Sequence, residues 1–258
     1  MKMLSKSQIK LISSLRQKKF RDKLNLFVAE GEKIIFDLAK TFRCKYLISS
    51  QESLLSLVAA DQYIKVNSDD ELKQISSLST PHKIIAVFEK PVSLPNIDFL
   101  AIKNKLVLAV DSVQDTGNFG TIIRVADWYG IDNIVCSNNT VDVFNPKTVQ
   151  ATMGALANVN ITYTDLFDFL VRAQTHDIPI YGTFLYGNNI YRESLETRGI
   201  VVVGNEGNGI SDEIANIVTN RLTIPNFSNR SHKSESLNVA IATAIVCSEF
   251  CRYNQMSL

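Results

Sequence analysis

Three short polar segments, far apart in the sequence, carry residue types that could bind and orient a ligand. They are residues 118–124, 204–209 and 236–238, and the first two follow the apolar runs 106–110 and 200–203. In an open α/β sheet, ligands bind at the carboxyl ends of the strands. If the apolar runs are such strands, the three segments meet in one site, and the C-terminal part of the chain is the catalytic half.

The first segment holds Asn118 and Arg124. Asparagine is a good N-cap for the helix that the following residues predict, so Asn118 has a structural interpretation as well as a functional one. Arg124 lies in sequence among Ile122, Ile123 and Val125, and a guanidinium in apolar surroundings needs an anionic or carbonyl partner. A phosphate or carboxylate of a ligand would supply this partner, and from this segment alone both interpretations stand.

The second segment has glycines at positions 204, 207 and 209, in the order G-x-x-G-x-G. A dinucleotide-binding fingerprint needs the order G-x-G-x-x-G leading directly into a helix. The order therefore excludes a nicotinamide or flavin site of that type. Glycine lets the backbone approach a ligand closely, and Glu206 stands in this loop either as a ligand contact or as an exposed loop acid.

The third segment begins with Ser236, which would cap a C-terminal helix. The N-terminus of a helix presents unpaired backbone N–H groups that favour anionic ligands. The loop before it carries Arg230, His232 and Lys233, which suit a phosphate-bearing partner.

The elements that must position these segments alternate between strand and helix from residue 105 onward. Continuous apolar runs predict strands of a mostly parallel sheet that is buried on both faces, and hence an α/β fold. Gly130 is expected to end the first helix. The predicted strands are 106–110, 133–136, 178–184, 200–203 and 222–224, and the predicted helices are 120–129, 146–156 and 211–218.

The N-terminal part predicts a smaller α/β domain. Pro91 and Pro95 break any helix there and begin a linker, so we expect one domain at residues 1–95 and a second at 104–258. Partial helical periodicity covers residues 1–20, an extended piece running into a helix covers 27–39, and short apolar runs cover 45–48, 63–66 and 84–88.

Basic residues are concentrated at the N-terminus, although the net charge of the whole chain is only +1. Between Lys2 and Lys23 there are eight basic residues and one acid, Asp22. Such a segment could neutralise phosphates, and it could equally be the solvated face of an amphipathic helix.

Composition excludes several classes of protein. No run approaches the roughly 18 apolar residues that span a bilayer, and the N-terminus lacks the apolar region of a signal peptide. The cysteines Cys44, Cys136, Cys247 and Cys251 have no metal-ligand spacing, and the last two, one helical turn apart, are expected in the core. We expect a cytoplasmic protein with no membrane partner and no metal site.

Together and in this order, the three segments resemble the motifs of the SpoU (TrmH-like) branch of the SPOUT superfamily of RNA 2′-O-ribose methyltransferases. The resemblance covers residues 104–252 and extends to the segment between the first two motifs, around Asn145, Lys147, Thr152 and Gly154. The family motif N-x-G-x-x-x-R matches Asn118, Gly120 and Arg124; the motif G-x-E-G-x-G matches Gly204, Glu206, Gly207 and Gly209; and the motif I-P followed by S-L-N-V matches Ile224, Pro225, Ser236, Leu237, Asn238 and Val239.

The N-terminal half is similar to the family's substrate-binding domain, a small α/β fold like certain ribosomal proteins, at Phe27, Glu30, Gly31 and Glu32. One departure concerns the third motif. The spacing between I-P and S-L-N is longer here than is usual in the family, so that residues 226–235 form an enlarged loop.

The resemblance implies S-adenosyl-L-methionine as the methyl donor, bound in a trefoil knot that the C-terminal strands and loops form. It implies that the backbone around Gly204, Ile224 and Leu237 holds the adenosine part of the donor. The implied catalytic cluster is Asn118, Arg124, Glu206, Ser236 and Asn238.

In this resemblance Arg124 faces the target ribose and its phosphate, either as a general base or as a phosphate clamp. A guanidinium holds its proton very tightly, which favours the clamp. Glu206 would hold Arg124 or Asn118 in place rather than transfer protons. The family works as homodimers in which one subunit completes the other's site, so a homodimer is expected.

The implied substrate is RNA, with ribosomal RNA expected because of the N-terminal RNA-binding domain and transfer RNA as the alternative. A second hypothesis is a catalytically inactive RNA-binding or ribosome-assembly protein on the same fold. The intact Asn118, Arg124, Glu206 and Asn238 argue against it. A small-molecule enzyme that uses a nucleotide is disfavoured because Walker and dinucleotide spacings are absent.

Overall fold

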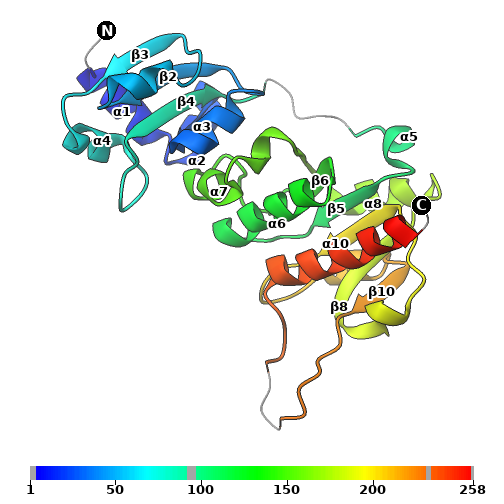
Figure 1. The fold of residues 1–258 in the computed structure, drawn as a ribbon. Helices are drawn as coiled ribbons and strands as arrows, with labels where there is room; N and C mark the ends of the chain where they lie inside the picture. The colour runs from blue at the N-terminus through cyan, green and yellow to red at the C-terminus, as the bar shows by residue number, and fades with distance from the viewer. Residues whose placement is uncertain (1–3, 92–96, 231–233, 257–258) are drawn as a thin grey trace. The chain divides into compact units, whose positions relative to one another are not determined.

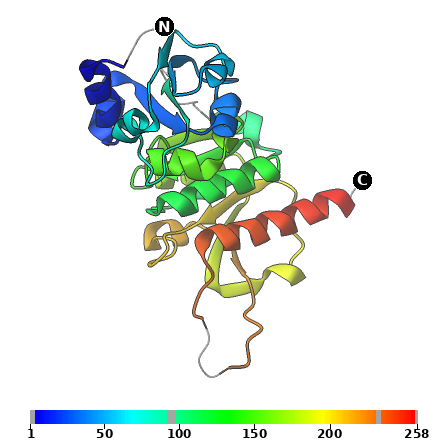
Figure 2. The same cartoon turned by 60° about the vertical axis from the view of Figure 1, so that its left-hand side comes forward.

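The computed structural model describes residues 4–91, 97–230 and 234–256, with side chains described up to residue 252. The chain divides into two compact units, and each has its own sheet and its own core (Figures 1 and 2). Unit 1 comprises residues 1–93 and 142–158, and unit 2 comprises residues 94–141 and 159–258.

Unit 1 is built on a four-stranded sheet in the order β1-β4-β2-β3. β4 is antiparallel to both β1 and β2, whereas β3 runs parallel to β2. The strands are β1 (Leu26–Glu30), β2 (Cys44–Ser49), β3 (Gln62–Lys65) and β4 (Ile84–Glu89), and the helices are α1 (Lys6–Ser14), α2 (Lys18–Leu24), α3 (Glu32–Leu38), α4 (Asp69–Ile75), α7 (Pro146–Thr152) and the short η1 (Glu52–Ser56) and η2 (Ala155–Ala157).

These elements confirm the strands predicted for the N-terminal part, but the helix predicted over residues 1–20 is interrupted between α1 and α2. The interruption has a physical cause. The carbonyl oxygens of Leu15 and Arg16 accept hydrogen bonds from the guanidinium of Arg21, at 2.8 and 2.9 Å, instead of continuing a helical ladder. Residues 1–3 of that prediction, and residues 92–96 of the predicted linker, lie outside the described residues.

Arg21 is buried, so it is neither a free phosphate ligand nor part of a solvated helix face. Its guanidinium donates to Asp142 Oδ2 at 2.6 and 3.0 Å, and the two side chains are only 2% and 11% exposed. Arg16 donates to the backbone oxygen of Ser76. A part of the basic N-terminal segment therefore neutralises acceptors within unit 1, as a buried charge requires.

The segment 142–158 follows β6 in the chain but belongs to the compact core of unit 1. The ring of Phe144 packs on that of Phe27 with centroids 4.8 Å apart. Thr41 Oγ1 donates to the carbonyl oxygen of Ala157 at 2.9 Å. Together with the Arg21–Asp142 pair, these contacts hold the segment along its length.

Unit 2 is built on a six-stranded sheet in the order β10-β8-β9-β5-β6-β7, and every neighbouring pair is parallel. This confirms the predicted α/β class. The strands are β5 (Leu106–Val110), β6 (Asn133–Ser137), β7 (Asn160–Thr164), β8 (Ile180–Asn189), β9 (Gly199–Val203) and β10 (Asn220–Thr223), and the helices are α5 (Phe99–Ile102), α6 (Thr116–Trp128), α8 (Leu166–Gln174), α9 (Asp212–Ala215), α10 (Val239–Met256) and the short η3 (Ile190–Arg192).

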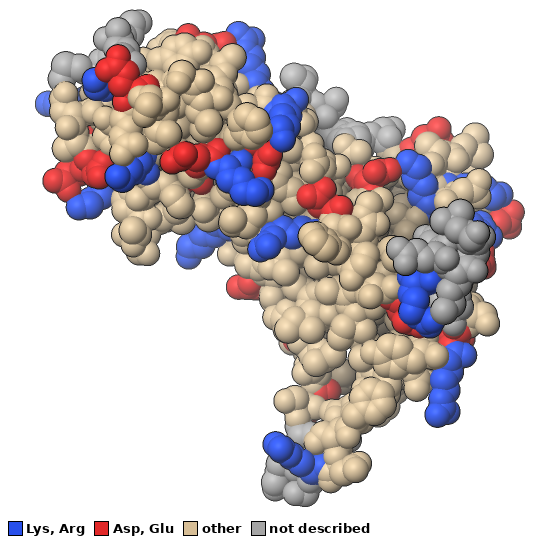
Figure 3. Space-filling view, in the orientation of Figure 1, with Lys and Arg blue, Asp and Glu red and all other residues tan. Residues whose placement is uncertain are grey.

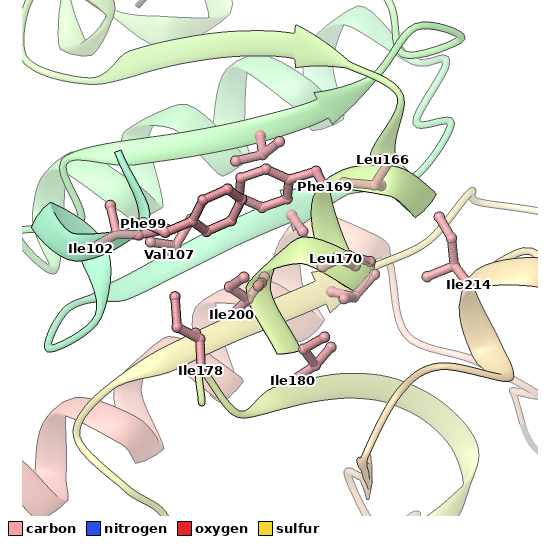
Figure 4. Close-up of a cluster of buried hydrophobic side chains, with 14 of the residues drawn as sticks. Phe99, Ile102, Val107, Leu166, Phe169, Leu170, Ile178, Ile180, Ile200 and Ile214 are labelled. Carbon is pink, nitrogen blue, oxygen red and sulfur yellow. The ribbon is translucent and has the colours of Figure 1, made fainter. Parts of the chain in front are cut away.

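Helices cover both faces of this sheet. On one face, Phe99 of α5 and Phe169 of α8 stack in a core that includes Ile180 of β8 (Figure 4). Successive residues of a strand point to opposite faces, so the next residue, Tyr181, faces the other side of the sheet. The centroid of its ring lies 4.9 Å from that of Phe250 of α10. Because both faces are covered, the central strands read as continuous apolar runs without alternation.

Several boundaries differ from the prediction. β7 was not predicted, because it is an edge strand of mixed polarity that pairs only with β6. The left-handed conformation of Met153, with φ of 53°, ends α7 before the predicted residue 156. α6 begins earlier than predicted, α9 ends earlier, and β8 continues to Asn189.

None of the described helices has the length and apolar character needed to cross a membrane. Cys44, Cys136 and Cys247 are buried free thiols and Cys251 is half-buried. Burial raises the pKa of the Cys44 thiol to about 12, so this group stays protonated.

A matched pair of threonines in α7 tests the packing of unit 1. Both are fully buried, but Thr152 Oγ1 donates to the carbonyl of Val149 at 2.7 Å, whereas Thr148 Oγ1 has no partner among the described residues. Thr148→Val removes an unsatisfied hydroxyl and should raise the free energy of unfolding by about 1 kcal/mol. Thr152→Val should lower it by a similar amount, and denaturant unfolding that finds the same sign for both variants would contradict this account.

Candidate functional site

The carboxyl ends of β5, β9 and β10 lie at one edge of the unit 2 sheet, because all its strands run in the same direction. The three polar segments of the sequence follow these strand ends. Residues 118–124 lie in the first turns of α6, 204–209 follow β9, and 236–238 precede α10. The expectation that they meet is confirmed by hydrogen bonds between their side chains.

Asn118 lies in the first turn of α6 and does not cap it. The cap is Asp115, whose Oδ1 accepts a hydrogen bond from the backbone N–H of Asn118 at 2.7 Å. The structural alternative for Asn118, that of the N-cap, is therefore wrong, since an acid three residues earlier already accepts from the free N–H. The side chain of Asn118 stays available, and its Nδ2 donates to Glu206 Oε1 at 3.0 Å.

The glycine-rich loop after β9 folds back on itself. Backbone hydrogen bonds join Asn205 and Gly209 in both directions, at 2.9 and 3.0 Å. A Cβ atom on Gly204 would lie 2.1 Å from the carbonyl carbon of Gly209. Only glycine allows so close a return of the backbone, and the return presents Glu206 to the start of α6.

The carboxylate of Glu206 is an acceptor for three hydrogen bonds from residues 114–118, at and just before the start of α6. They come from Asn118 Nδ2 and from the backbone N–H groups of Gln114, at 3.3 Å, and Asp115, at 3.2 Å. Burial raises the pKa of Glu206, but the hydrogen bonds outweigh burial and hold the pKa below its ordinary value. Glu206 is therefore charged at neutral pH and fixes its neighbours in place.

Asn238 completes the connection from the third segment. Its Nδ2 donates to Asn118 Oδ1 at 2.8 Å, and its Oδ1 accepts from the backbone N–H groups of Ala240, at 3.0 Å, and Ile241, at 3.3 Å. Asn238 thus caps α10, and the role expected for Ser236 as the cap is wrong. Ser236 is exposed at the wall of the adjoining cavity.

The three side chains form one carboxylate–amide chain, Glu206–Asn118–Asn238. Since a carboxylate only accepts, Asn118 must turn its Nδ2 toward Glu206, and its Oδ1 is then left for Asn238. Each amide has one orientation that satisfies its neighbours. The chain is tied to the backbone at both ends, so it holds the remaining N–H groups of the two amides in fixed directions.

Arg124 does not join this chain within one subunit. It follows Asn118 by six residues, and at about 100° per residue it faces another side of α6. Its side chain is exposed and has no hydrogen-bond or ion-pair partner in the part of the chain that the structure describes. The expectation of apolar surroundings is wrong, because Ile122 and Ile123 turn into the core while Arg124 faces solvent.

A cavity of about 1060 Å³ adjoins the chain in unit 2. Its lining includes all three residues expected to hold a cofactor, Gly204, Ile224 and Leu237, together with Glu206 and Ser236. Of the basic loop residues, Arg230 also lines the cavity, whereas His232 and Lys233 lie outside the described residues. The structure thus brings every predicted site residue except Arg124 to this cavity or to the carboxylate–amide chain beside it.

Two residues that support the site were missed in the sequence. Asp115 is recognisable as an acid directly before a helix, which is the usual signal of an N-cap. Asn205 Nδ2 donates to the carbonyl of Ser112 at 2.8 Å and so ties the glycine-rich loop to the end of β5. No sequence signal could reveal this contact, because the two residues are far apart in the chain.

Models of known protein families match both the N-terminal and the C-terminal part of the chain. The model of the SpoU rRNA Methylase family matches residues 105–248. The model of the MRM3-like substrate binding domain matches residues 6–86. Among known proteins, the chain is 30% identical over 242 residues to the 23S rRNA (guanosine(2553)-2′-O)-methyltransferase RlmP of Bacillus subtilis (strain 168), which covers 93% of this chain and 94% of that protein.

Two solved structures are similar over almost the whole chain. A Porphyromonas gingivalis protein of the TrmH family of RNA methyltransferases has a TM-score of 0.87 and 40% identity, covering 97% of this chain and 99% of that one. An AdoMet-bound rRNA methyltransferase from Sinorhizobium meliloti has a TM-score of 0.81 and 29% identity, covering 98% and 97% of the two chains.

Gly204→Ala tests the close return of the glycine-rich loop, and Gly207→Ala is its matched control. A Cβ on Gly207 would meet only Asn205 Oδ1, at 3.6 Å. Gly204→Ala should lower the free energy of unfolding by about 2 kcal/mol or more, and Gly207→Ala by less than about 0.5 kcal/mol. Thermal unfolding gives both values, and equal stability of the two variants would mean that the loop does not depend on the absence of a side chain at position 204.

Proposed function

Because this chain belongs to the SpoU rRNA Methylase family, we propose that it transfers a methyl group from S-adenosyl-L-methionine to the 2′-hydroxyl of a ribose in ribosomal RNA. The observation that carries the proposal is the carboxylate–amide chain Glu206–Asn118–Asn238, which joins all three motifs beside one cavity. The RNA class is supported by the relative from Bacillus subtilis, whose name gives it a ribosomal substrate.

The residues of the cavity fit the methyl donor. Gly204 brings bare backbone to the wall, where peptide groups can meet the edge of an adenine base. Ile224 and Leu237 add apolar side chains that suit the faces of the ring. When bound, S-adenosyl-L-methionine supplies an electrophilic methyl group, so the protein itself has only to hold, align and desolvate the two reactants.

The carboxylate–amide chain is suited to alignment rather than to proton transfer. Asn118 and Asn238 each use one N–H of the side chain within the chain and keep a second for a ligand acceptor. Glu206 holds both amides in place, and its lowered pKa keeps it ionised near neutral pH. Correct alignment alone can lower a barrier by several kcal/mol.

Arg124 acts as the clamp on the phosphate next to the target ribose, and it reaches the site from a second copy of the chain. Thr121, Arg124 and Trp128 follow one another at helical spacing and are all exposed, with Trp128 at 84%. So large an exposed apolar side chain favours a covering partner, and a partner that covers Trp128 would also receive Arg124.

A homodimer with this arrangement is therefore part of the proposal. α10, which packs against α6, exposes Ile241 at 54% as well. Figure 3 shows a broad uncharged surface where the first turns of α10 lie.

We further propose that the C-terminal strands and loops form a trefoil knot and that the protein works in the cytoplasm. In this proposal residues 1–95 bind the RNA and residues 104–258 carry catalysis. The match of residues 6–86 to a substrate-binding domain supports the RNA-binding role.

Mapping of 2′-O-methyl groups tests the function directly. In ribosomal RNA from cells that lack this protein, one ribose methylation should be missing, and the purified chain with S-adenosyl-L-methionine should restore it. Transfer to transfer RNA instead would change the substrate class but keep the chemistry. RNA binding without transfer to either substrate would favour the inactive RNA-binding protein.

Mixed dimers test whether two copies build each site. Arg124→Ala should abolish transfer while cofactor affinity, measured by calorimetry, stays unchanged, and Asn118→Ala should abolish transfer as well. When the two variants are co-refolded, half of the dimers are mixed and each has one intact site, so about one quarter of the wild-type rate should return. A mixture that stays inactive would place Arg124 in its own subunit's site, and loss of cofactor affinity in Arg124→Ala would refute the clamp.

A further inference from the structure

The end of strand β8 departs from the regular ladder. Its partner β10 pairs Arg221 with Gly182 and the next residue, Leu222, with Asn188, so residues 183–187 bulge out of the sheet. A hydrogen bond holds the middle of the bulge, because Thr223 Oγ1 donates to the carbonyl of Leu185 at 3.1 Å. Its last residue passes close to β10, since a Cβ on Gly187 would come within 2.7 Å of the carbonyl oxygen of Arg221.

This bulge presents two apolar side chains to solvent instead of hiding them. Leu185 is 60% exposed and Tyr186 is 89% exposed. Aromatic side chains usually bury a large area. The ring of Tyr186, which the bulge holds in water, therefore leaves its faces free to bind a partner.

A third exposed apolar side chain comes from the enlarged loop between β10 and α10, whose described residues extend away from the sheet in Figures 1 and 2. Phe227 is 79% exposed. Its neighbour Asn226 shapes the loop, because its Oδ1 accepts from the N–H of Ser228 at 2.9 Å and its Nδ2 donates to the carbonyl of Ser234 at 3.1 Å.

All three side chains line the same cavity as Gly204 and Glu206. Its volume of about 1060 Å³ slightly exceeds the range of about 300–1,000 Å³ that is usual for a single small ligand. A small ligand buries most of its surface and so belongs in the enclosed part beside Gly204, which is itself buried. The exposed rim of Leu185, Tyr186 and Phe227 is left for a group that enters from solvent.

The charges at this rim suit a polyanion. Arg221 and Arg230 both line the cavity and both are exposed, and the guanidinium of Arg221 lies over the ring of Phe184 at 4.1 Å. Glu235 also lines the cavity, whereas Glu206 is engaged with Asn118. Aromatic rings between basic residues are the recurring means by which proteins hold single-stranded RNA, through base stacking and phosphate contacts.

We propose that Leu185, Tyr186 and Phe227 form a stacking wall that receives an unpaired nucleobase of the RNA substrate at the mouth of the methyl-donor cavity. The proposal rests on the proposed function and deepens it, because it makes the substrate a single-stranded or unstacked RNA segment rather than an intact duplex. Duplex bases are already stacked and cannot offer a face to Tyr186 or Phe227.

The test uses the full-length protein and variants of the stacking wall. Tyr186→Ala and Phe227→Ala should each raise KM for ribosomal RNA about 10-fold, as expected for the loss of one base–aromatic stack, while Tyr186→Phe and Phe227→Tyr stay within about twofold of the wild type. Cofactor affinity and oligomeric state should not change. Leu100→Ala, which removes a 75% exposed apolar side chain on α5, is the control and should leave KM unchanged.

A second readout follows stacking itself. A single-stranded RNA that carries 2-aminopurine should lose fluorescence when it binds the wild type or the variants that keep a ring, Tyr186→Phe and Phe227→Tyr. It should keep its fluorescence when it binds the double variant that carries both Tyr186→Ala and Phe227→Ala. A duplex with the same label should show no such difference. This signal would not respond if the two rings had only a structural role.

The outcomes separate the alternatives. A wild type that transfers no methyl group to RNA refutes the proposed function, and the proposed stacking wall is then refuted as well. If the wild type is active, an unchanged KM in both alanine variants overturns the wall alone. Weakened cofactor binding in those variants would assign the rings to the donor, and a change from dimer to monomer would assign them to a second copy of the chain; either result overturns the proposal.

Discussion

The site depends on the carboxylate of Glu206, because it accepts hydrogen bonds that join the glycine-rich loop to the residues around the start of α6. It accepts from the backbone N–H groups of Gln114 and Asp115, just before α6, and from the side chain of Asn118, and through Asn118 it fixes Asn238 at the start of α10. A carboxylate that accepts several hydrogen bonds stays ionised. The same contacts that build the site therefore also make Glu206 a weaker base than an ordinary glutamate, which suits it to holding its neighbours in place.

The backbone makes this arrangement possible. The loop after β9 can place Glu206 at the start of α6 only because it returns over Gly204 with no room for a side chain. Parallel strands supply the rest, since their carboxyl ends all lie at one edge. The chemistry of the proposed function needs little more from the protein than fixed donors and a shaped cavity, because the reactive group is carried by the cofactor.

Each unit is held by its own polar contacts. Unit 1 uses part of its basic N-terminus internally, and the buried pair of Arg21 and Asp142 holds the segment 142–158 in its core. In unit 2, the carboxylate–amide chain provides alignment, and the exposed rim of Tyr186 and Phe227 adjoins it at the same cavity. A rim on a bulge and an enlarged loop can vary without disturbing the chain, so selection of RNA and catalysis can change independently.

The sequence by itself determined the α/β class, most strands and the grouping of the three motifs, because apolar runs predict buried strands whose carboxyl ends meet at one edge. The cavity residues Gly204, Ile224 and Leu237 were implied by the resemblance of the motifs to one family, and the glycine at position 204 also predicts a close backbone approach. Only the tertiary structure decided which side chains meet. Asp115 rather than Asn118 caps α6, Asn238 rather than Ser236 caps α10, and Glu206 binds Asn118 rather than Arg124. A helix turns its neighbouring residues to different sides and a loop brings distant ones together, so partners are set by three-dimensional direction, which the order of residues does not contain.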